Sequence, residues 1–280
     1  MVYGSTLKMT APEKTGYTFK GWSRTSGSTG TLNSTTGDST YVCGAGAATL
    51  TAQWQINQYT ITLHALANKF DTNTYSENGL GGTVQIDSGA ANNKSTNATY
   101  NYNTTYTIKA AAYTGYKFEG WYTNPSLSGT AVSTSASYTM SLGASNITYY
   151  AKFSVQSYQI TVNPNGATGG TNLSGWYSAP GTAASAINGV TSSRTITMVY
   201  GSTLKMTAPE KTGYTFKGWS RTSGSTGTLN STTGDSTYVC GAGAATLTAQ
   251  WTAKVYTITY IPNGGSVTPT SDTFTIESAI

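Results

Sequence analysis

A long internal repeat limits the fold of this chain more than any other feature. Residues 1–54 reappear letter for letter as residues 198–251, at an offset of 197. A weaker copy lies between them, since GYTFKGW at Gly16–Trp22 and Gly213–Trp219 becomes GYKFEGW at Gly115–Trp121. Self-similarity at a fixed period indicates an array of like modules and argues against a single large enzyme.

Aromatic landmarks define the period of the repeat. The tryptophan that ends each GYxFxGW motif is followed 32 residues later by a second aromatic residue. The opening strand also recurs, at Tyr59, Tyr158 and Tyr256, with spacings of 99 and 98 residues. The module is therefore about 98 residues long, which is near the usual size of a domain.

These landmarks predict four segments. Residues 1–57 are the C-terminal half of a module, 58–156 and 157–254 are complete modules, and 255–280 are the N-terminal part of a further module. On this interpretation the chain starts and stops inside modules, and we expect it to be a section of a longer array.

Composition predicts a mainly β protein. Only 9% of the residues are charged. Thr, Tyr, Val and Ile favour half-buried strands, whereas Gly and Asn favour turns. The motif segments alternate with period two, as strands do. Only four residues join one module to the next, at 55–58, 154–157 and 252–255, and none of these linkers contains Gly or Pro. We expect an elongated, semi-rigid tandem array of small modules, β-grasp-like or sandwich-like in topology.

The landmark aromatics are the predicted structural core. In the closing strand Leu50, Ala52 and Trp54 share one face, and a bulge at Gly21 would turn Trp22 toward it. One helix is predicted, a short one over residues 178–187. The predicted core residues are Trp22, Trp54, Trp121, Phe153, Trp219 and Trp251.

The residues needed for common enzyme chemistry are missing. His64 is the only histidine, so a Ser–His–Asp triad or a histidine-based zinc site is not predicted. The ten acidic residues are scattered without a metal-binding or paired-carboxylate spacing. We therefore predict no catalytic residue, no metal and no cofactor.

The two cysteines occupy one position in two copies of the module, so they cannot pair within a module. Cys43 and Cys240 align with Leu142 of the middle copy. An apolar residue in the same register favours a buried, unreactive thiol, and an intermolecular disulfide is the alternative.

Charge and hydropathy limit the partners. The net charge is +5 and the pI about 9.0, but the Lys and Arg residues form no cluster, so nucleic acid is not an expected partner. No apolar stretch is long enough for a membrane span. Trp176 and Tyr177 lie outside the repeated landmarks and are the candidate ligand contacts, since an exposed aromatic pair can stack on a sugar.

The combination of an opening Y-x-I-T, GYxFxGW and a closing L-x-A-x-W/F resembles the B-repeat of internalin-type bacterial surface proteins, and its divergent branch in particular. The resemblance implies an extracellular, surface-attached array of β-rich modules without catalytic residues. This module is longer than the family's, and the extra length lies in its polar first half, for example at 68–99.

The function predicted from the sequence is structural and non-enzymatic. We expect a section of an extracellular bacterial fibre or adhesin stalk, with neighbouring modules as its partners. Two alternatives remain at this point: a subunit of a self-assembling extracellular filament, in which other copies are the partners, and a carbohydrate-binding surface module for host or cell-wall glycans.

Overall fold

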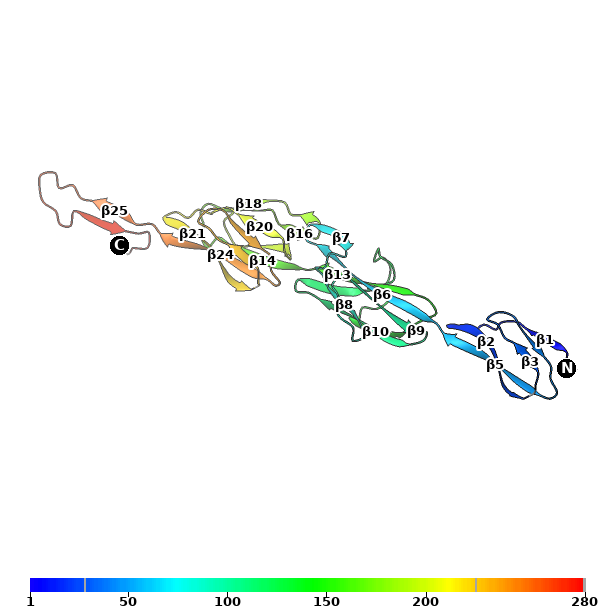
Figure 1. Cartoon of the computed structure of the whole chain (residues 1–280). Coiled ribbons are helices and arrows are strands. Elements are labelled where there is room, and N and C mark those ends of the chain that lie inside the picture. The colour runs from blue at the N-terminus through cyan, green and yellow to red at the C-terminus, as the bar shows by residue number, and fades with distance from the viewer. Residues whose placement is uncertain (28, 225, 279–280) are drawn as a thin grey trace. The chain divides into compact units, whose positions relative to one another are not determined.

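The computed structural model describes residues 1–27, 29–224 and 226–278, and every regular element in these ranges is a β-strand (Figure 1). The prediction of a mainly β protein made of small β-rich modules is confirmed. The helix predicted over 178–187 is wrong. Strands β16 (Tyr177–Ala179) and β17 (Thr182–Ala183) pair there instead, across a turn in which Gly181 has a φ of +72°.

The chain forms two compact units. The first contains residues 1–65, 83–111 and 119–152, and the second contains residues 66–82, 112–118 and 153 onward. In the middle segment, β6 (Gln58–Lys69), β11 (Tyr116–Tyr122) and β13 (Ile147–Val155) each have three or more residues in both units. The boundaries predicted at residues 58, 157 and 255 stay a prediction.

Residues 157–254 form two sheets around one core. One sheet has the strand order β19-β14-β24-β21, and the other has the order β18-β15-β20-β23-β22. The pair β14–β24 is parallel, and the other pairs in these sheets are antiparallel. The strands are β14 (Ser157–Asn163), β15 (Thr171–Ser174), β18 (Ile187–Val190), β19 (Arg194–Val199), β20 (Thr203–Met206), β21 (Tyr214–Gly224), β22 (Thr228–Asn230), β23 (Ser236–Val239) and β24 (Ala245–Ala253).

Apolar side chains from both sheets fill the space between them. Ile160 and Leu247 of the first sheet and Leu204 and Tyr238 of the second are completely buried in the same cluster. Their burial follows from the alternation of apolar and polar residues along each strand. The arrangement is therefore sandwich-like.

Residues 1–57 repeat the second half of this arrangement. Their two sheets have the orders β1-β4-β3 and β2-β5. The strands are β1 (Thr6–Met9), β2 (Tyr17–Gly27), β3 (Thr31–Asn33), β4 (Ser39–Val42) and β5 (Ala48–Ile56). The register is also repeated, because Phe19 lies opposite Trp54 as Phe216 lies opposite Trp251.

The middle segment and the C-terminal segment contain the remaining strands. One middle sheet has the order β12-β10-β8, and the other has the order β11-β13-β6-β7 with β9 also paired to β6. The C-terminal segment carries a two-stranded sheet, β25-β26. These strands are β7 (Thr72–Ser76), β8 (Gly82–Ile86), β9 (Ser95–Asn101), β10 (Thr105–Ala112), β12 (Ser137–Ser141), β25 (Tyr256–Thr259) and β26 (Ser271–Phe274).

The bulge predicted in the GYxFxGW motif is confirmed. In β2 the register shifts between Phe19 and Gly21, and Gly21 has a φ of +112°. The same shift occurs in β21 before Gly218. One extra residue turns the following side chain to the other face of the strand, and Trp219 is accordingly only 4% exposed.

Candidate functional site

The same tight turn precedes every GYxFxGW motif. The N–H of Tyr17 donates to the carbonyl oxygen of Lys14 at 3.0 Å, and Tyr116 and Tyr214 make the equivalent bond three residues back. The glycine before each tyrosine has a positive φ, between +78° and +83°. A turn with φ near +80° at its third residue strongly favours glycine, so the motif's first glycine is explained by local geometry.

The linker after each closing strand is hydrogen-bonded to this turn and to the segment that follows it. In the first unit, the N–H of Asn57 donates to the carbonyl of Gly16 at 2.9 Å, and the carbonyl of Asn57 accepts from the N–H of Tyr102 at 2.8 Å. We call this arrangement, comprising the turn glycine, the linker residue and the tyrosine, the linker clamp.

The second unit contains a second linker clamp with the same pattern. The N–H of Gln156 donates to the carbonyl of Gly115 at 2.8 Å, and the N–H of Tyr200 donates to the carbonyl of Gln156 at 2.9 Å. Both bonds use backbone groups only. The same bonds therefore form in both clamps, although the linker residue is Asn57 in one and Gln156 in the other.

The tyrosine ring of each linker clamp lies against the turn glycine. A β-carbon on Gly115 would lie 2.4 Å from the ring of Tyr200, and one on Gly16 would lie 2.1 Å from the ring of Tyr102. No side chain fits at these separations. Each ring also meets the tyrosine of the motif edge-on: the centroids of Tyr116 and Tyr200 are 6.2 Å apart at 72°. Burial and the neighbouring Tyr200 hydroxyl raise the pKa of Tyr116.

Linker side chains add to both clamps. Thr18 Oγ1 donates to Asn57 Oδ1 at 2.6 Å, and Asn57 Nδ2 donates to the hydroxyl of Tyr59 at 3.3 Å. In the second clamp, the hydroxyl of Tyr158 donates to Gln156 Oε1 at 2.9 Å. The side chain of Asn57 is thus bonded to β2 and to β6, the strand that follows it, and the side chain of Gln156 is bonded to β14, the strand that follows it.

A third turn makes half of the same arrangement. The N–H of Lys254 donates to the carbonyl of Gly213 at 2.8 Å. Here the side chain of Ile276 lies over Gly213 in the place that a tyrosine occupies in the clamps. The hydroxyl of Tyr214 donates to Glu277 Oε1 at 2.9 Å, and this bond raises the pKa of Tyr214.

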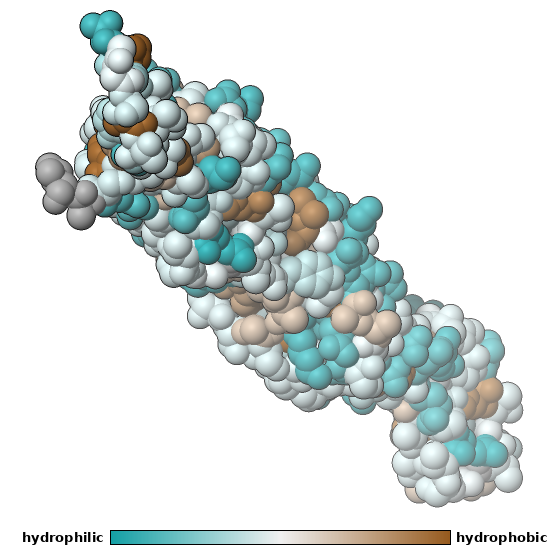
Figure 2. Space-filling view, turned by 90° about the vertical axis from the view of Figure 1, so that its left-hand side faces the viewer, coloured by the Kyte–Doolittle hydropathy of each residue, from teal (hydrophilic) through white to brown (hydrophobic). Residues whose placement is uncertain are grey.

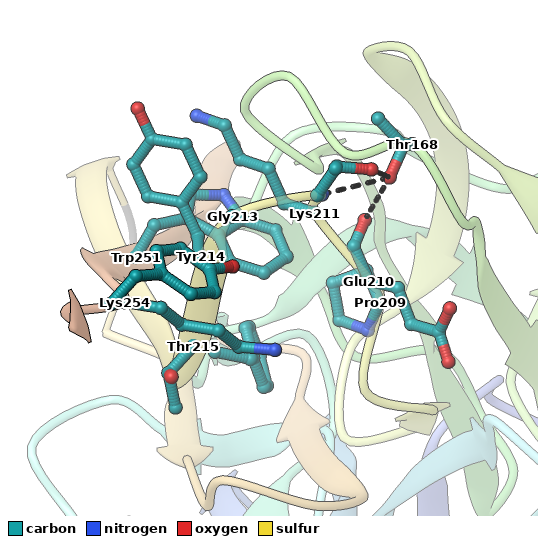
Figure 3. Close-up of a pocket in the computed structure, with 12 residues that line it drawn as sticks. Thr168, Pro209, Glu210, Lys211, Gly213, Tyr214, Thr215, Trp251 and Lys254 are labelled. Carbon is teal, nitrogen blue, oxygen red and sulfur yellow. Dashed lines mark hydrogen bonds between the residues drawn. The ribbon is translucent and has the colours of Figure 1, made fainter. Parts of the chain in front are cut away.

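A groove lies beside the turn in both identical copies. In the cavity of about 590 Å³ drawn in Figure 3, Lys211 Nζ lies 4.1 Å from the ring centroid of Tyr214 and 5.9 Å from that of Trp251. The copy at Lys14 has the same geometry and a cavity of about 390 Å³. An ammonium group over aromatic faces is a stabilising contact. In the ranges that the structure describes, no three His, Cys, Asp or Glu side chains gather as metal ligands would.

The predicted core aromatics fall into two groups. Trp121 and Phe153 are completely buried, and Trp219 is 4% exposed. Trp22, Trp54 and Trp251 are partly buried. In the repeated halves each tryptophan packs on the motif phenylalanine: the ring centroids of Phe19 and Trp54 are 5.4 Å apart, and those of Phe216 and Trp219 are 5.8 Å apart.

The candidate ligand contacts do not form an exposed pair. Trp176 is 3% exposed and belongs to the core of residues 157–254. Tyr177 is partly buried and meets the ring of Phe70 edge-on, with 5.3 Å between centroids. The interpretation of Trp176 as an exposed side chain is therefore corrected, because the chain turns its indole into the sandwich.

The histidine and the cysteines are separate from the clamps. His64 stacks on Tyr150 with 5.1 Å between the ring centroids. Cys240 is 1% exposed, and burial raises the pKa of its thiol to about 12. Cys43 is only partly buried, although its local sequence is the same.

Sequence reasoning missed the clamp tyrosines. Tyr3, Tyr102 and Tyr200 occupy the same position in successive copies, each before a residue with positive φ (Gly4, Asn103 or Gly201). This spacing could have identified the three tyrosines. In the middle copy, however, the surrounding residues are NYNT where the other two copies have VYGS, so the similarity is weak.

Two family models match the chain. The Listeria-Bacteroides repeat domain matches residues 72–152, and the divergent InlB B-repeat domain matches residues 1–58 and 179–255. Together these ranges include all three GYxFxGW motifs, the whole of the closing strands β5 and β24, and the first six residues of β13.

The sequence similarity to individual proteins is weaker than the similarity to these family models. A Gly-rich membrane protein of Evansella cellulosilytica is 27% identical over 261 residues, which are 93% of this chain and 24% of that protein. The chain thus spans about a quarter of this curated relative. No helix in the described part of the chain has the length and apolar character that crossing a membrane requires.

Solved structures resemble the fold only loosely. The Bacillus anthracis TIE protein matches with a TM-score of 0.38 and 9% identity, over 85% of this chain and 44% of that one. A fragment of the pilus adhesin SpaC from Lactobacillus rhamnosus GG matches with a TM-score of 0.30 and 13% identity, over 70% of this chain and 98% of the fragment. At these scores neither structure carries an argument about function.

Proposed function

Because this chain belongs to the internalin-type B-repeat family of bacterial cell-surface proteins, we propose that it is a non-enzymatic structural section of an extracellular bacterial fibre or adhesin stalk. Its task is mechanical: successive modules provide length, and the linkers between them resist bending. The partners in this role are the neighbouring modules of the same array.

The linker clamp is the observation that supports this proposal. A linker of four residues without internal order would act as a hinge. Here Gln156 is bonded through its N–H to Gly115 and through its carbonyl to Tyr200. Opening one clamp breaks two backbone hydrogen bonds, worth about 1 kcal/mol each, and one aromatic pair, worth about 1 kcal/mol. A bend at this linker therefore costs about 3 kcal/mol.

The chemistry of the grooves fits the same role. Lys211 and Tyr214 line a groove to which Lys254 and Tyr256 also contribute. Lys211 is held over aromatic rings, where it stabilises the turn rather than presenting a nucleophile. The glycan-binding alternative has lost its main residue, since Trp176 is buried.

Small-angle scattering with a matched pair of variants tests the proposal. A module of about 100 residues is roughly 35 Å across, so three module-equivalents in a stiff row reach about 100 Å. Tyr200→Ala removes the ring of the second clamp and should broaden the distance distribution. Tyr3→Ala is the control, because Tyr3 has the same neighbours in sequence but is 77% exposed. A compact parent chain, or equal scattering from both variants, would contradict the stalk.

A further inference from the structure

An aromatic cavity lies beside the second linker clamp. Its volume is about 560 Å³, which is within the usual range of small-ligand sites. All of the residues that line it belong to the second compact unit. We call it the tyrosine cavity, because its apolar and aromatic walls are the side chains of Phe70, Leu80, Tyr113, Tyr116 and Tyr200.

These walls differ from the surface around them. The face of the molecule drawn in Figure 2 is mostly hydrophilic or neutral, and hydrophobic residues show on it only as small patches. Phe70 and Leu80 are the only Phe, Leu, Ile, Val or Met residues in the polar segment 68–82, and both line the tyrosine cavity. Leu80 is 46% exposed and Tyr113 is 42% exposed. Large apolar side chains left exposed around a hollow are typical of a binding site.

Hydrogen bonds hold the walls in place. The carbonyl oxygen of Phe70 accepts a bond from the N–H of Gly181 at 2.9 Å. The N–H of Tyr113 donates to the carbonyl oxygen of Gly81 at 3.0 Å, and Tyr200 is held by the linker clamp. The cavity is therefore formed without a ligand, and binding requires little further ordering of its walls.

The middle copy of the module differs from the two identical copies at this place. Lys14 and Lys211 stand two residues before the turn glycine, and each ammonium lies about over the ring of the motif tyrosine, at 3.9 and 4.1 Å from its centroid. In the middle copy the same position is Tyr113. A phenol ring thus replaces an ammonium group beside Tyr116, and the middle copy gains an aromatic wall.

The polar groups of the tyrosine cavity are mainly hydrogen-bond donors. Among the described residues that line it, none has a carboxylate or a carboxamide side chain. Burial, the hydroxyl of Tyr200 and Asp71, in that order, raise the pKa of Tyr116, so this hydroxyl keeps its proton. The side-chain donors are the ammonium of Lys69 and the hydroxyls of Tyr113, Thr114, Tyr116 and Tyr200. A ligand that accepts hydrogen bonds and donates few suits such a site.

We propose that the tyrosine cavity binds a proline-rich peptide in the polyproline II conformation. A proline residue offers a carbonyl acceptor and an apolar ring and has no N–H. Aromatic-lined grooves bind such segments because the extended helix is already formed and loses little entropy. The ring centroids of Tyr116 and Tyr200 are 6.2 Å apart, which corresponds to about two residues of this helix at ~3.1 Å each, so one short segment contacts both rings.

Two observations define the ligand further. Sugar hydroxyls donate as well as accept hydrogen bonds, and the described lining has no carboxylate or carboxamide to receive them. No two of the seven prolines in residues 1–280 lie within three positions of each other. The ligand is therefore a peptide rather than a glycan, and its proline-rich segment lies outside these residues.

The inference does not depend on the stalk. A stiff array that binds no proline-rich peptide would overturn the inference and leave the proposed function intact. A flexible array that binds the peptide would do the opposite.

Fluorescence anisotropy with a labelled octaproline tests the binding on the whole chain. We expect saturable binding of one peptide per chain. Octaproline made of D-residues has the same composition and the opposite hand, so it should not bind. No saturable binding of the L-peptide, or equal binding of both peptides, would overturn the proposal. So would a chain that binds cellohexaose and not octaproline.

Two matched variants locate the site. Leu80→Asp places a carboxylate beside the apolar walls and should weaken binding about 10-fold or more. Val132→Asp is the control, because Val132 is 42% exposed and lies in the first unit, away from the lining residues. Both positions are exposed, so both variants should fold. Equal affinities of the two variants would contradict binding in this cavity.

A third variant uses a residue that the chain already carries at the equivalent position. Tyr113→Lys gives the middle copy the lysine of the two identical copies, which fold with it. It removes one aromatic wall and adds a charge, so it should also weaken octaproline binding about 10-fold. Parent-like affinity of Tyr113→Lys would show that the phenol ring is not part of the site.

Discussion

The glycine of the linker clamp gives the sharpest test of how the linkers are held. Gly115 has a φ of +83°, and a β-carbon there would lie 2.4 Å from the ring of Tyr200. Gly115→Ala therefore imposes two costs. The left-handed backbone costs about 1–2 kcal/mol for a residue with a β-carbon, and the tyrosine ring is pushed from its place.

A second glycine separates the two costs. Gly129 has nearly the same backbone, with a φ of +78°, but nothing lies within 4 Å of its β-carbon position. Gly129→Ala carries only the backbone strain. The excess for Gly115→Ala is the lost edge-to-face contact with Tyr116, about 1 kcal/mol, together with weakened backbone bonds at Gln156 and Tyr200, about 1 kcal/mol each. We therefore expect Gly115→Ala to destabilise the protein by about 2–3 kcal/mol more than Gly129→Ala does.

Hydrogen exchange at the amides of the linker clamp measures this difference in destabilisation directly. The N–H groups of Gln156 and Tyr200 are the two clamp donors. Since about 1.4 kcal/mol is a factor of ten, Gly115→Ala should speed their exchange about 30- to 100-fold, and Gly129→Ala should not change it. In a Tyr200→Ala background, Gly115→Ala should speed exchange at Gln156 less than it does in the parent, because only the backbone strain remains. Equal exchange in the two glycine variants would refute the claim that the ring over Gly115 secures the linker.

Four further outcomes are expected. Trp219→Ala should cost about 3–5 kcal/mol of unfolding free energy in denaturant titration, as large core deletions do; a loss below 1 kcal/mol would contradict its burial. Cys240 should resist a thiol reagent at pH 8 that labels Cys43, because its pKa is raised to about 12; equal labelling rates would contradict this. Burial and its bond to Asp87 raise the pKa of Tyr100 to about 12. The stability that Tyr100 contributes is therefore complete below pH 10 and is lost as the pH rises toward 12. If ultraviolet titration showed that Tyr100 itself ionises near pH 10, the bond would be contradicted. Residues 157–254 alone should melt cooperatively, and a broad, non-cooperative melt would contradict that boundary.

The fold class and the repeat could be predicted because both rest on local patterns. Alternation along the closing strand places Leu247 and Ala249 on the buried face, and the extra residue at Gly218 explains how Trp219 reaches the core. Both depend only on neighbouring residues.

Contacts between distant segments could not be predicted in the same way. Trp176 is apolar, outside the repeat and preceded by Gly175, so sequence alone could not distinguish an exposed ring from a core residue. Its place in the core is fixed by the strands around it, β15 and β20, whose pairing joins residues more than 30 positions apart. The short helix expected after it was wrong for a related reason, since Gly181 closes a hairpin.

The linker clamp explains which residues of the junction repeat and which do not. The linkers QINQ, SVQS and TAKV share no pattern, yet Asn57, Gln156 and Lys254 all donate a backbone N–H to the turn glycine. A backbone bond does not constrain the side chain, so the linker sequence is free to vary. The glycine is constrained by its positive φ and by the ring above it. The stiffness proposed for the array therefore depends on a glycine and a tyrosine more than 80 residues apart, and not on the linker sequence itself.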